Sequence, residues 1–491
     1  MVDIPNSSDN CQTAKRLTVV EKVGYGLGDT ASNLYWKLFE YFQLIFYTDV
    51  FGITPAAAGT MFFVTKLFDA INDPLVGMLA DRTRTAWGRF RPYLVWMAVP
   101  FALTGMLTFY TPDFSPRGKL IYAYITYAAV FIAYTAINGP YSALMGVMSS
   151  DPVERTRLST WRFVLAFCGA IVVQKFTEPL VAWFGGTETR LVNGIETIVV
   201  LDKQAGFFWT VVCYALVAVF LFLITFFTTR ERVEPVEDSS GTWKTDLSNL
   251  IRNRPWLVMS AFAMAQVVAA WIRGSATAFY FSYYVSATAK VTYFGFDLKP
   301  SFGDFLVVGS VACILGMLVT HPLRSWLGSK WLMIFASTLV ALCSATLCFL
   351  RPDQIQWMYV LQIAGAFCGG PITVLTWAMY ADVADHYEWK HNRSATGLVF
   401  AAATLAQKVG GAIGGAIPAW SLFVFGFVQP VDGIRQVQSD ATLGGIVAMM
   451  SLMPAAFLIL SVFVMMLYPL NKKTLQQIQT DLKSRKQKLN E

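Results

Sequence analysis

Twelve long apolar stretches dominate this sequence, and each is long enough to cross the hydrocarbon core of a membrane, which takes about 20 residues as a helix. The chain is 55% hydrophobic and 14% charged, whereas soluble proteins have about 25% charged residues. We therefore predict an all-α, multi-pass membrane protein with twelve transmembrane helices. The predicted spans are roughly 30 to 50, 56 to 80, 92 to 112, 119 to 148, 158 to 183, 207 to 229, 256 to 286, 302 to 320, 330 to 350, 355 to 383, 396 to 426 and 441 to 469.

The basic residues of the loops predict how these spans cross the membrane. Cytoplasmic loops carry an excess of Lys and Arg, and here every even-numbered loop is basic; the second holds Arg82, Arg84, Arg89 and Arg91. Both termini are therefore expected in the cytoplasm. The net charge of +7 follows from this distribution, so we expect a lipid bilayer around the protein and no nucleic acid as a partner.

The sequence offers no chemistry of an enzyme. The seven cysteines and three histidines show no metal-ligand spacing, and we find no nucleophile constellation and no phosphate-binding glycine loop. The first apolar stretch carries Lys37 and Glu40 and has no small-residue cleavage site behind it, which indicates a retained span and not a signal peptide. We expect neither an enzymatic activity nor a cofactor.

Two carboxylates lie deep in the second span, where each charged side chain costs about 2.5 to 3.5 kcal/mol to insert. Asp69 and Asp73 are four residues apart, so a helix places them one turn above the other, with Lys66 on the same face and Asn72 as a neutral oxygen donor. This group suits a small hard cation such as Na+, or a proton shared between coupled acids. The alternative is a buried ion pair between Lys66 and Asp69 that locks two helices together.

A polar stretch in the middle of the chain divides the spans into two sets of six. We expect a tail at 1–21, a first bundle at 22–229, a cytoplasmic linker at 230–254, a second bundle at 255–469 and a basic tail at 470–491. A short internal repeat supports duplication, because Gly77-Met-Leu precedes Trp87 by the same spacing with which Gly316-Met-Leu precedes Trp326. Transporters built from such halves bind substrate between them near the midplane.

Seven short segments of this chain stand out as motifs: Tyr25-Gly-Leu-Gly-Asp29, Phe46-Tyr-Thr-Asp49-Val, Asp69-Ala-Ile-Asn-Asp73-Pro, Asp81-Arg-Thr-Arg-Thr-Ala-Trp87-Gly-Arg-Phe-Arg-Pro92, Asn138-Gly-Pro140-Tyr, Trp161-Arg162-Phe and Ala381-Asp-Val-Ala-Asp385-His-Tyr. These segments resemble the glycoside-pentoside-hexuronide:cation symporters, the melibiose-permease-like branch of the major facilitator superfamily. The resemblance runs in order from about residue 21 to about residue 480. It implies a major facilitator fold and cation-coupled import through the cytoplasmic membrane of a bacterium, by a protein that works as a monomer.

The resemblance places the coupling-cation site on the paired acids of the second span. Asp69 and Asp73 would bind Na+ or a proton, with Asn72 beside them and Thr135 of the fourth span as a further oxygen. If the cation is Na+, the same two carboxylates are its metal ligands.

The resemblance also implies a sugar site with altered chemistry. Two acids that grip sugar hydroxyls in the family are amides here, Asn33 and Asn138, and the stacking aromatic one turn after the second acid corresponds to Ser142. Arg162 of the fifth span and Lys408 of the eleventh are retained. Amides still donate and accept hydrogen bonds, but the loss of two charges argues against the galactoside of the permease itself.

The charge balance of the expected cavity favours an acidic substrate. Lys37 shares a helix face with Asn33, and Arg273 adds a cation in the seventh span. We therefore expect a glycoside or uronide oligosaccharide, with a uronate-bearing glycoside or a short uronide oligomer first. Lys37 could instead pair with Glu40 three residues later, and Arg273 could be a structural cation. Aromatic residues that could hold a sugar, or else pack in the core or at the membrane interface, are Tyr35, Trp36, Trp377 and Tyr380.

Acids at the cytoplasmic end of the tenth span predict a gate, in which they would meet Lys390 or Arg393. Solvation of the helix end is the alternative. The residues assigned to this gate are Arg82, Arg89, Asp382 and Asp385.

Two other functions remain open for this sequence. Relatives of the family carry lysolipids, and a lysolipid carrier should show a wide apolar side opening, whereas a sugar carrier should bring Asn33, Asn138, Arg162 and Lys408 to one cavity. A membrane enzyme or receptor with the same fold is the other alternative, and the chain shows no catalytic constellation to support it.

Overall fold

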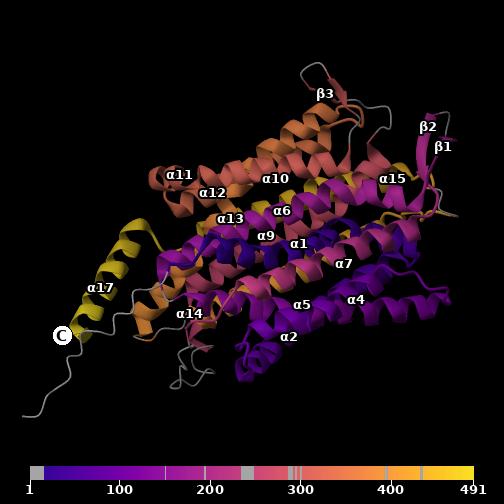
Figure 1. Cartoon of the computed structure of the whole chain (residues 1–491). Helices are drawn as coiled ribbons and strands as arrows, with labels where there is room; N and C mark the ends of the chain where they lie inside the picture. The colour runs from indigo at the N-terminus through magenta and orange to yellow at the C-terminus, as the bar shows by residue number, and fades with distance from the viewer. Residues whose placement is uncertain are drawn as a thin grey trace, which may run out of the picture.

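Long helices run side by side along a common axis and form most of this protein (Figure 1). The computed structural model describes residues 16–149, 151–192, 195–233, 248–285, 291–293, 296–298, 301–391, 393, 396–431 and 435–490. The first half contains α1 (Val19–Phe46), η1 (Tyr47–Phe51), α2 (Pro55–Arg82), α3 (Arg91–Trp96), α4 (Ala98–Thr108), α5 (Pro116–Met148), α6 (Pro152–Gly185), β1 (Thr187–Val192), β2 (Ile195–Val200) and α7 (Lys203–Thr228).

The second half repeats this plan of long helices and one hairpin. It contains α9 (Arg254–Phe279), η2 (Tyr280–Tyr284), β3 (Val291–Tyr293), β4 (Phe296–Leu298), α10 (Phe302–Leu318), α11 (Thr320–Leu327), α12 (Ser329–Thr346), η3 (Leu347–Phe349), α13 (Ile355–His391), α14 (Thr396–Val424), α15 (Asp440–Met450), α16 (Leu452–Met466) and α17 (Lys472–Asn490). The all-helical prediction is confirmed apart from the two short antiparallel hairpins β1–β2 and β3–β4. Of the predicted tails and linker, residues 1–15 and 234–247 lie outside the described part of the chain.

Each predicted span falls on one helix or on two consecutive helices. Eight of the described helices are long and apolar enough to cross a membrane, or nine if the bent pair α10 and α11 counts as one span. The helices α1 and α2 have 28 residues each but carry buried charged side chains. The third predicted span is divided into α3 and α4 at Met97.

Helix α1 begins well before the predicted start of the first span. Its N-terminus is closed by a capping box in which Thr18 Oγ1 accepts from the Glu21 backbone N–H and the Glu21 carboxylate accepts from the Thr18 backbone N–H at 2.9 Å. This exchange satisfies two backbone donors that a helix start leaves open. The sequence prediction followed hydrophobicity alone and therefore missed the polar first turns.

The two ends of the helix bundle carry different elements, with β-hairpins at one end and short or peripheral helices at the other. We call the end with the hairpins β1–β2 and β3–β4 the hairpin end, and the opposite end, with α11 and α17, the basic end (Figure 1). The Arg82–Arg91 connection between α2 and α3 also lies at the basic end, because Glu231 at the end of α7 contacts it there.

The two halves meet along three helix pairs, α2 with α14, α1 with α9, and α6 with α10. Within the second half, α10 and α13 approach so closely that a Cβ on Gly370 would lie 2.5 Å from the Cys313 carbonyl oxygen, and one on Gly316 would lie 2.0 Å from the Phe367 carbonyl oxygen. Glycine is therefore required at this crossing, as in other tightly packed membrane helices.

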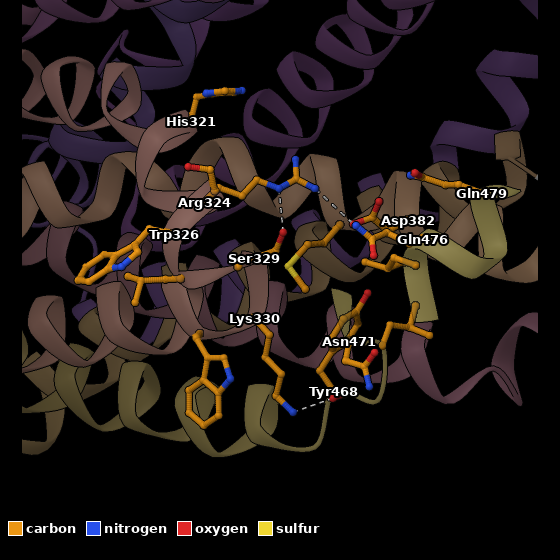
Figure 2. Close-up of a pocket in the computed structure, with 17 residues that line it drawn as sticks. His321, Arg324, Trp326, Ser329, Lys330, Asp382, Tyr468, Asn471, Gln476 and Gln479 are labelled. Carbon is orange, nitrogen blue, oxygen red and sulfur yellow. Dashed lines mark hydrogen bonds and ion pairs between the residues drawn. The ribbon is translucent and has the colours of Figure 1, made fainter. Parts of the chain in front are cut away.

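Helix α17 packs against the basic end of the second half. Its apolar side chains Ile478 and Leu482 are buried in the core cluster formed by α9, α12 and α13, and Asp481 accepts a hydrogen bond from the Trp389 indole of α13 at 2.9 Å. A cavity remains between α11, the start of α12, α13 and α17 (Figure 2). We call it the basic-end cavity.

Candidate functional site

A buried carboxylate of α2 joins three helices midway along the bundle. Asp69 is only 4% exposed. Its Oδ1 accepts a hydrogen bond from the Thr135 hydroxyl of α5 at 2.8 Å, and its Oδ2 lies 2.8 Å from the Lys408 ammonium of α14. Because α14 belongs to the second half, this side chain connects the two halves. Lys408, which the resemblance assigned to the sugar, therefore contacts the carboxylate assigned to the cation.

Lys66 reaches the second half instead of forming the ion pair with Asp69 that the sequence left open. Its ammonium lies 3.1 Å from the centre of the Trp271 ring of α9 and donates to the Gly411 carbonyl oxygen of α14 at 3.4 Å. A cation over an indole face is attracted by the ring's negative face. Gly415 leaves the space for it, since a Cβ there would lie 3.0 Å from Lys66 Nζ.

Of the other two residues expected in the cation site, the structure describes the side chain of Asn72 but not that of Asp73. Asn72 is half-buried on α2, and its Nδ2 is enclosed without a hydrogen-bond partner among the described residues. The side chain of Asp73 lies outside the described part of the chain. Its backbone continues α2 one turn beyond Asp69. Carboxylate, hydroxyl and amide oxygens are the donors that a hard cation prefers, so Asp69, Thr135 and Asn72 fit such a cation.

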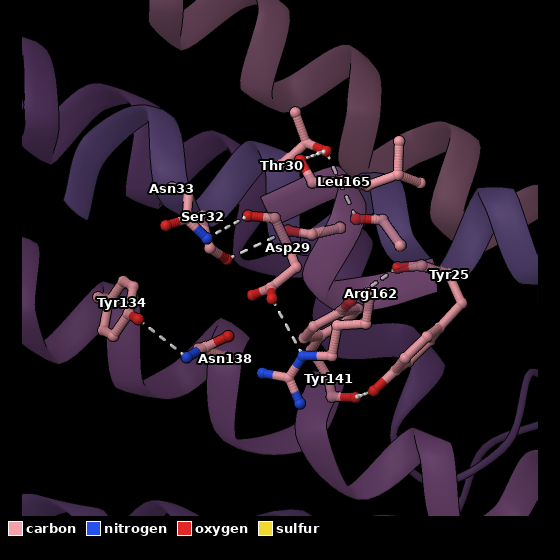
Figure 3. Close-up of polar contacts among 12 residues, drawn as sticks. Tyr25, Asp29, Thr30, Ser32, Asn33, Tyr134, Asn138, Tyr141, Arg162 and Leu165 are labelled. Carbon is pink, nitrogen blue, oxygen red and sulfur yellow. Dashed lines mark hydrogen bonds and ion pairs between the residues drawn. The ribbon is translucent and has the colours of Figure 1, made fainter. Parts of the chain in front are cut away.

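A second buried ion pair connects α1 to α6. Asp29 Oδ2 lies 3.1 Å from Arg162 Nε, and the guanidinium is 5.3 Å from the centre of the Tyr141 ring of α5 (Figure 3). Tyr141 in turn stacks on Tyr25 with ring centres 4.7 Å apart, and each hydroxyl donates to the other residue's carbonyl oxygen. Arg162 is thus held by a carboxylate and a tyrosine pair of the first half.

The two amides lie close to this pair. Asn33 Nδ2 donates to the Asp29 carbonyl oxygen at 2.9 Å, and Asn138 Nδ2 donates to the Tyr134 hydroxyl at 3.0 Å (Figure 3). The Oδ1 of Asn138 is buried without a hydrogen-bond partner among the described residues. Tyr134 also stacks on Trp36 with ring centres 5.4 Å apart. An aromatic pair therefore stands beside an amide oxygen that can still accept a hydrogen bond.

A cavity of about 690 Å³ opens between α2, α5 and α14. We call it the central cavity; at one end it reaches Thr135 and Lys408, and at the other it reaches Ala80 and Phe90 towards the basic end. Its other lining residues are Val76, Gly77, Tyr134, Asn138, Gly139, Pro140, Ser142, Ala143, Leu398, Ala401, Ala402, Thr404 and Leu405. Of the four polar residues expected to converge on one cavity, Asn138 and Lys408 line this one, whereas Asn33 and Arg162 contact Asp29 outside its lining.

The other cations and the tryptophan assigned to the sugar have partners elsewhere. Lys37 Nζ lies 2.6 Å from Glu40 Oε2, the local pair that the sequence left open. Arg273 donates to Gln362 Oε1 at 2.7 Å. Trp377 stacks on Phe400 in the core cluster of the second half and does not line the central cavity.

Contacts between the halves close the hairpin end. The Tyr283 hydroxyl of η2 donates to Asp49 of η1 at 2.6 Å. The Gln429 amide donates to the carbonyl oxygens of Thr48 and Ile53 at 2.8 Å each. Because all three bonds cross from one half to the other, the halves are joined at the hairpin end, while the central cavity extends towards the basic end.

The residues assigned to the gate have partners that differ from those expected. Asp382 lies 3.8 Å from Arg324 of α11, and not beside Lys390 or Arg393. The reason is geometric, since α13 runs on to His391 and Lys390 is therefore about 12 Å further along the same helix. Asp385, three residues further along α13, adds a second negative charge that acts on Asp382. Arg82 is exposed at the end of α2.

A carboxylate after α7 holds the connection that contains Arg89. Glu231 accepts hydrogen bonds from the backbone N–H groups of Arg89, Phe90 and Arg91 at 2.9, 2.7 and 2.9 Å. These donors form the start of α3, and the positive end of the helix dipole there also stabilises the negative carboxylate. Arg89 enters this arrangement through its backbone.

Sequence reasoning missed Asp29, Tyr134 and Arg324. Helical spacing could have found the first two, because Asp29 lies one turn before Asn33 and Tyr134 one turn before Asn138. The pairing of Arg324 with Asp382 has no such signal, since the two residues come from different helices.

Comparisons with known proteins agree with these observations. A family model described as MFS/sugar transport protein matches residues 24–472. The putative glycoside/cation symporter YagG of Escherichia coli (strain K12) is 36% identical over 86% of this chain and 88% of its own length. The isoprimeverose transporter of Lactiplantibacillus pentosus is 30% identical over 83% of this chain and 81% of its own length. The glucuronide carrier protein homolog of Escherichia coli (strain K12) is 29% identical over 94% and 95%.

Solved structures share the arrangement of helices at low sequence identity. The nucleoside transporter NupG superposes with a TM-score of 0.58 at 13% identity, covering 92% of this chain and 100% of its own. The D-xylose-proton symporter superposes with a TM-score of 0.56 at 13% identity, covering 92% and 97%. At such identities the likeness concerns the fold alone.

Proposed function

This chain belongs to the glycoside-pentoside-hexuronide:cation symporter family of the major facilitator superfamily, whose members are transporters and not enzymes, and on that premise we propose that it imports a neutral glycoside together with Na+ or H+. The observation that carries this proposal is Asp69, which is bound to Thr135 of one half and Lys408 of the other. A cation that binds such a carboxylate changes the contact between the halves, which is what coupling requires.

The protein lies in the bacterial cytoplasmic membrane with twelve spans and its basic end in the cytoplasm. The excess of Lys and Arg in the even-numbered loops supports this orientation. With the hairpin end joined across the halves and the central cavity directed to the basic end, the described conformation opens inward. Alternating access then requires that the contacts at the hairpin end break when the protein opens outward.

The cation site consists of Asp69 with Thr135, Asn72 and Asp73. Lys408 supplies a positive charge to Asp69, so an arriving Na+ or proton shares or displaces that charge. A secondary transporter needs this competition, because its carboxylate must be stabilised both with and without the cation.

The pairing of the buried cations supports a neutral glycoside over a uronide. The expectation of an acidic substrate rested on four cations, of which Lys37, Arg162 and Lys408 have carboxylate partners, and Arg273 is bonded to an amide oxygen. A cation paired with a carboxylate offers little net attraction to a substrate carboxylate, and Arg273, whose partner is neutral, does not line the central cavity. The relatives include a glucuronide carrier protein homolog as well as glycoside carriers, so the charges and not the family favour the neutral sugar.

Tyr134 and Asn138 provide the sugar contacts in the central cavity. Sugars are bound by aromatic faces and by groups that accept or donate hydrogen bonds to hydroxyls. The enclosed Asn138 Oδ1 is available as an acceptor, and Tyr134, backed by Trp36, supplies an aromatic surface in place of the one that Ser142 lacks. The relatives' names favour this reading over a lysolipid carrier.

The test is uptake into proteoliposomes that contain the purified protein. Labelled isoprimeverose, as a neutral probe, and a methyl glucuronide are offered with an inward Na+ gradient, with an inward proton gradient, or with neither. We expect accumulation of the neutral glycoside against its gradient only when one of the two cation gradients is present. Uptake of the glucuronide alone would contradict the neutral substrate, and uptake that ignores both gradients would contradict the symporter.

A further inference from the structure

The basic-end cavity lies entirely within the second half, away from the central cavity. It has a volume of about 810 Å³ and is formed by α11, the start of α12, α13 and α17 (Figure 2). None of the residues predicted to bind the cation or the sugar lines it. Asp382 on its wall is the single residue that it shares with the expected gate.

Several features place the mouth of this cavity at the level of a membrane surface. Trp326 and Trp331 stand on its rim and are 81% and 62% exposed, and exposed tryptophans gather where lipid headgroups begin. Helix α11 bends by 51° from α10 at this level. Helix α17 packs Ile478 and Leu482 against the protein core, and its sequence is rich in lysine, a positive charge that attracts anionic lipids at a cytoplasmic membrane surface.

Two fixed cations line the cavity with donors to spare. Arg324 donates through Nε to the Ser329 hydroxyl at 2.9 Å, and its Nη2 lies 3.8 Å from Asp382 (Figure 2); among the described residues its Nη1 meets no acceptor. Lys330 Nζ donates to the carbonyl oxygens of Met466 and Tyr468 at 2.8 Å each. An ammonium has three donors, so one N–H of Lys330 remains.

Buried polar atoms on the inner wall also lack hydrogen bonds. The Tyr468 hydroxyl and Asp382 Oδ2 both belong to residues that are at least nine-tenths buried and that line the cavity, and neither atom has a hydrogen-bond partner among the described residues. Within the described part of the chain, Asp382 Oδ2 has only the 3.8 Å ion-pair contact with Arg324 Nη2. Buried groups of this kind are costly unless a ligand or water satisfies them. The cavity thus combines two cations near its opening with a donor and an acceptor further in.

We propose that the basic-end cavity binds the headgroup of an anionic phospholipid, with its phosphate on Lys330, whose charge no carboxylate balances among the described residues, and on the remaining Nη1 donor of Arg324. A phosphate accepts several charge-assisted hydrogen bonds, which suits the remaining donors of the two cations. A hydroxyl-bearing headgroup reaches Asp382 and Tyr468 with its hydroxyls, and the acyl chains leave past Trp326 and Trp331. Basic pockets between helices on the cytoplasmic side are known to hold such headgroups. Free phosphate has the same chemistry but would not use the tryptophan rim.

The experiment measures lipid binding to the full-length protein in a neutral detergent. Dioleoylphosphatidylglycerol is titrated and retained lipid is counted by native mass spectrometry, with dioleoylphosphatidylcholine and inorganic phosphate as further probes. Removing a cation near an anionic lipid should weaken binding about fivefold. We therefore expect Arg324→Gln and Lys330→Gln each to lower phosphatidylglycerol affinity about fivefold. Lys330→Arg keeps the positive charge and should keep the affinity of the unaltered protein. Arg252→Gln, which removes an exposed arginine at the same end, should leave it unchanged.

A second pair of variants keeps both cations and tests the cavity itself. Gln476 lines the cavity from α17, whereas its neighbour Gln477 is exposed outside it. Gln476→Trp should block the lipid and Gln477→Trp should not. If the charge variants and Gln476→Trp bind as much phosphatidylglycerol as the unaltered protein, the proposal is overturned. Loss of bound phosphatidylglycerol on addition of millimolar inorganic phosphate would show that the site takes free phosphate, and would overturn the lipid assignment.

Discussion

The buried cations between and within the two halves each lie against a specific partner. Lys408 contacts Asp69, Arg162 contacts Asp29, and Lys66 lies over Trp271. A charge in the low-dielectric interior of a membrane protein must be paired or reach water. These pairings determine which charges remain available to bind a substrate or a coupling cation. They therefore also determine which single substitutions can test the roles of these residues.

Neutralising Asp69 should stop coupled transport and weaken the protein. Asp69→Asn leaves the Lys408 ammonium buried beside an amide, and breaking a buried ion pair typically costs about 3 to 5 kcal/mol. We expect a lower unfolding temperature and no cation-driven accumulation. The double variant Asp69→Asn, Lys408→Gln should regain most of the stability without regaining transport. Thermal unfolding and proteoliposome uptake measure the two effects, and concentrative uptake by the single variant would refute the role of Asp69.

Arg162 should not distinguish charged from neutral sugars. Its guanidinium is committed to Asp29, so Arg162→Gln should weaken a neutral glycoside and its uronide analogue by a similar factor. An arginine that bound the substrate carboxylate would instead cost the uronide an extra 2 to 5 kcal/mol or so. Competition against a labelled glycoside measures both affinities. Arg157→Gln on the same helix, which loses only a half-exposed pair with Glu154, is the control.

At the scale of helices, close crossings fix how the long elements lie against each other. Helices α10 and α13 cross where Gly316 and Gly370 face the partner backbone. Lipid tails are as apolar as the helix surfaces, so such packing, and not hydrophobic burial, holds membrane helices together.

A methyl group at this crossing should therefore destabilise the second half. Gly370→Ala would place a Cβ 2.5 Å from a backbone carbonyl oxygen that cannot move alone, and overpacking of this kind costs about 1 to 3 kcal/mol. Gly369→Ala on the same helix meets open space and should be neutral or slightly stabilising. Unfolding in detergent at increasing denaturant compares the two, and equal midpoints would show that the helices can separate freely there.

At the scale of the whole molecule, the two halves are joined at the hairpin end and separated by the central cavity towards the basic end. The contacts that join them include the two hydrogen bonds of Gln429 and the one between Tyr283 and Asp49. An ion pair between Lys175 and Asp304 and an aromatic contact between Phe42 and Phe302 add to them. Individual polar bonds of this kind suit a closure that must open in each transport cycle.

Removing one of these contacts should shift the protein towards its outward-open state. Gln429→Ala loses two bonds between the halves, each worth about 0.5 to 1.5 kcal/mol, so access from the hairpin end should rise by roughly 5- to 150-fold. The readout is labelling of Ser142→Cys in the central cavity by a membrane-impermeant thiol reagent, in a protein without its native cysteines. Gln354→Ala, whose side chain bonds only within the second half, is the control. Equal labelling of both variants would show that Gln429 does not hold the end closed.

The sequence by itself determined which segments are helical and which local pairs they carry. Apolar runs long enough for a bilayer predicted the spans, each of which falls on one helix or on two consecutive helices. The helical repeat placed Lys37 beside Glu40, and ordered motifs from Tyr25 to Tyr387 carried the family. Only the tertiary structure decided the partners of Lys408, Arg162 and Asp382, because each comes from a different helix and no sequence spacing encodes the distance between helices. Those long-range pairs are the reason that we propose a neutral substrate in place of the expected acidic one, since a cation attracts a charged ligand only when its own neighbours leave its charge unbalanced.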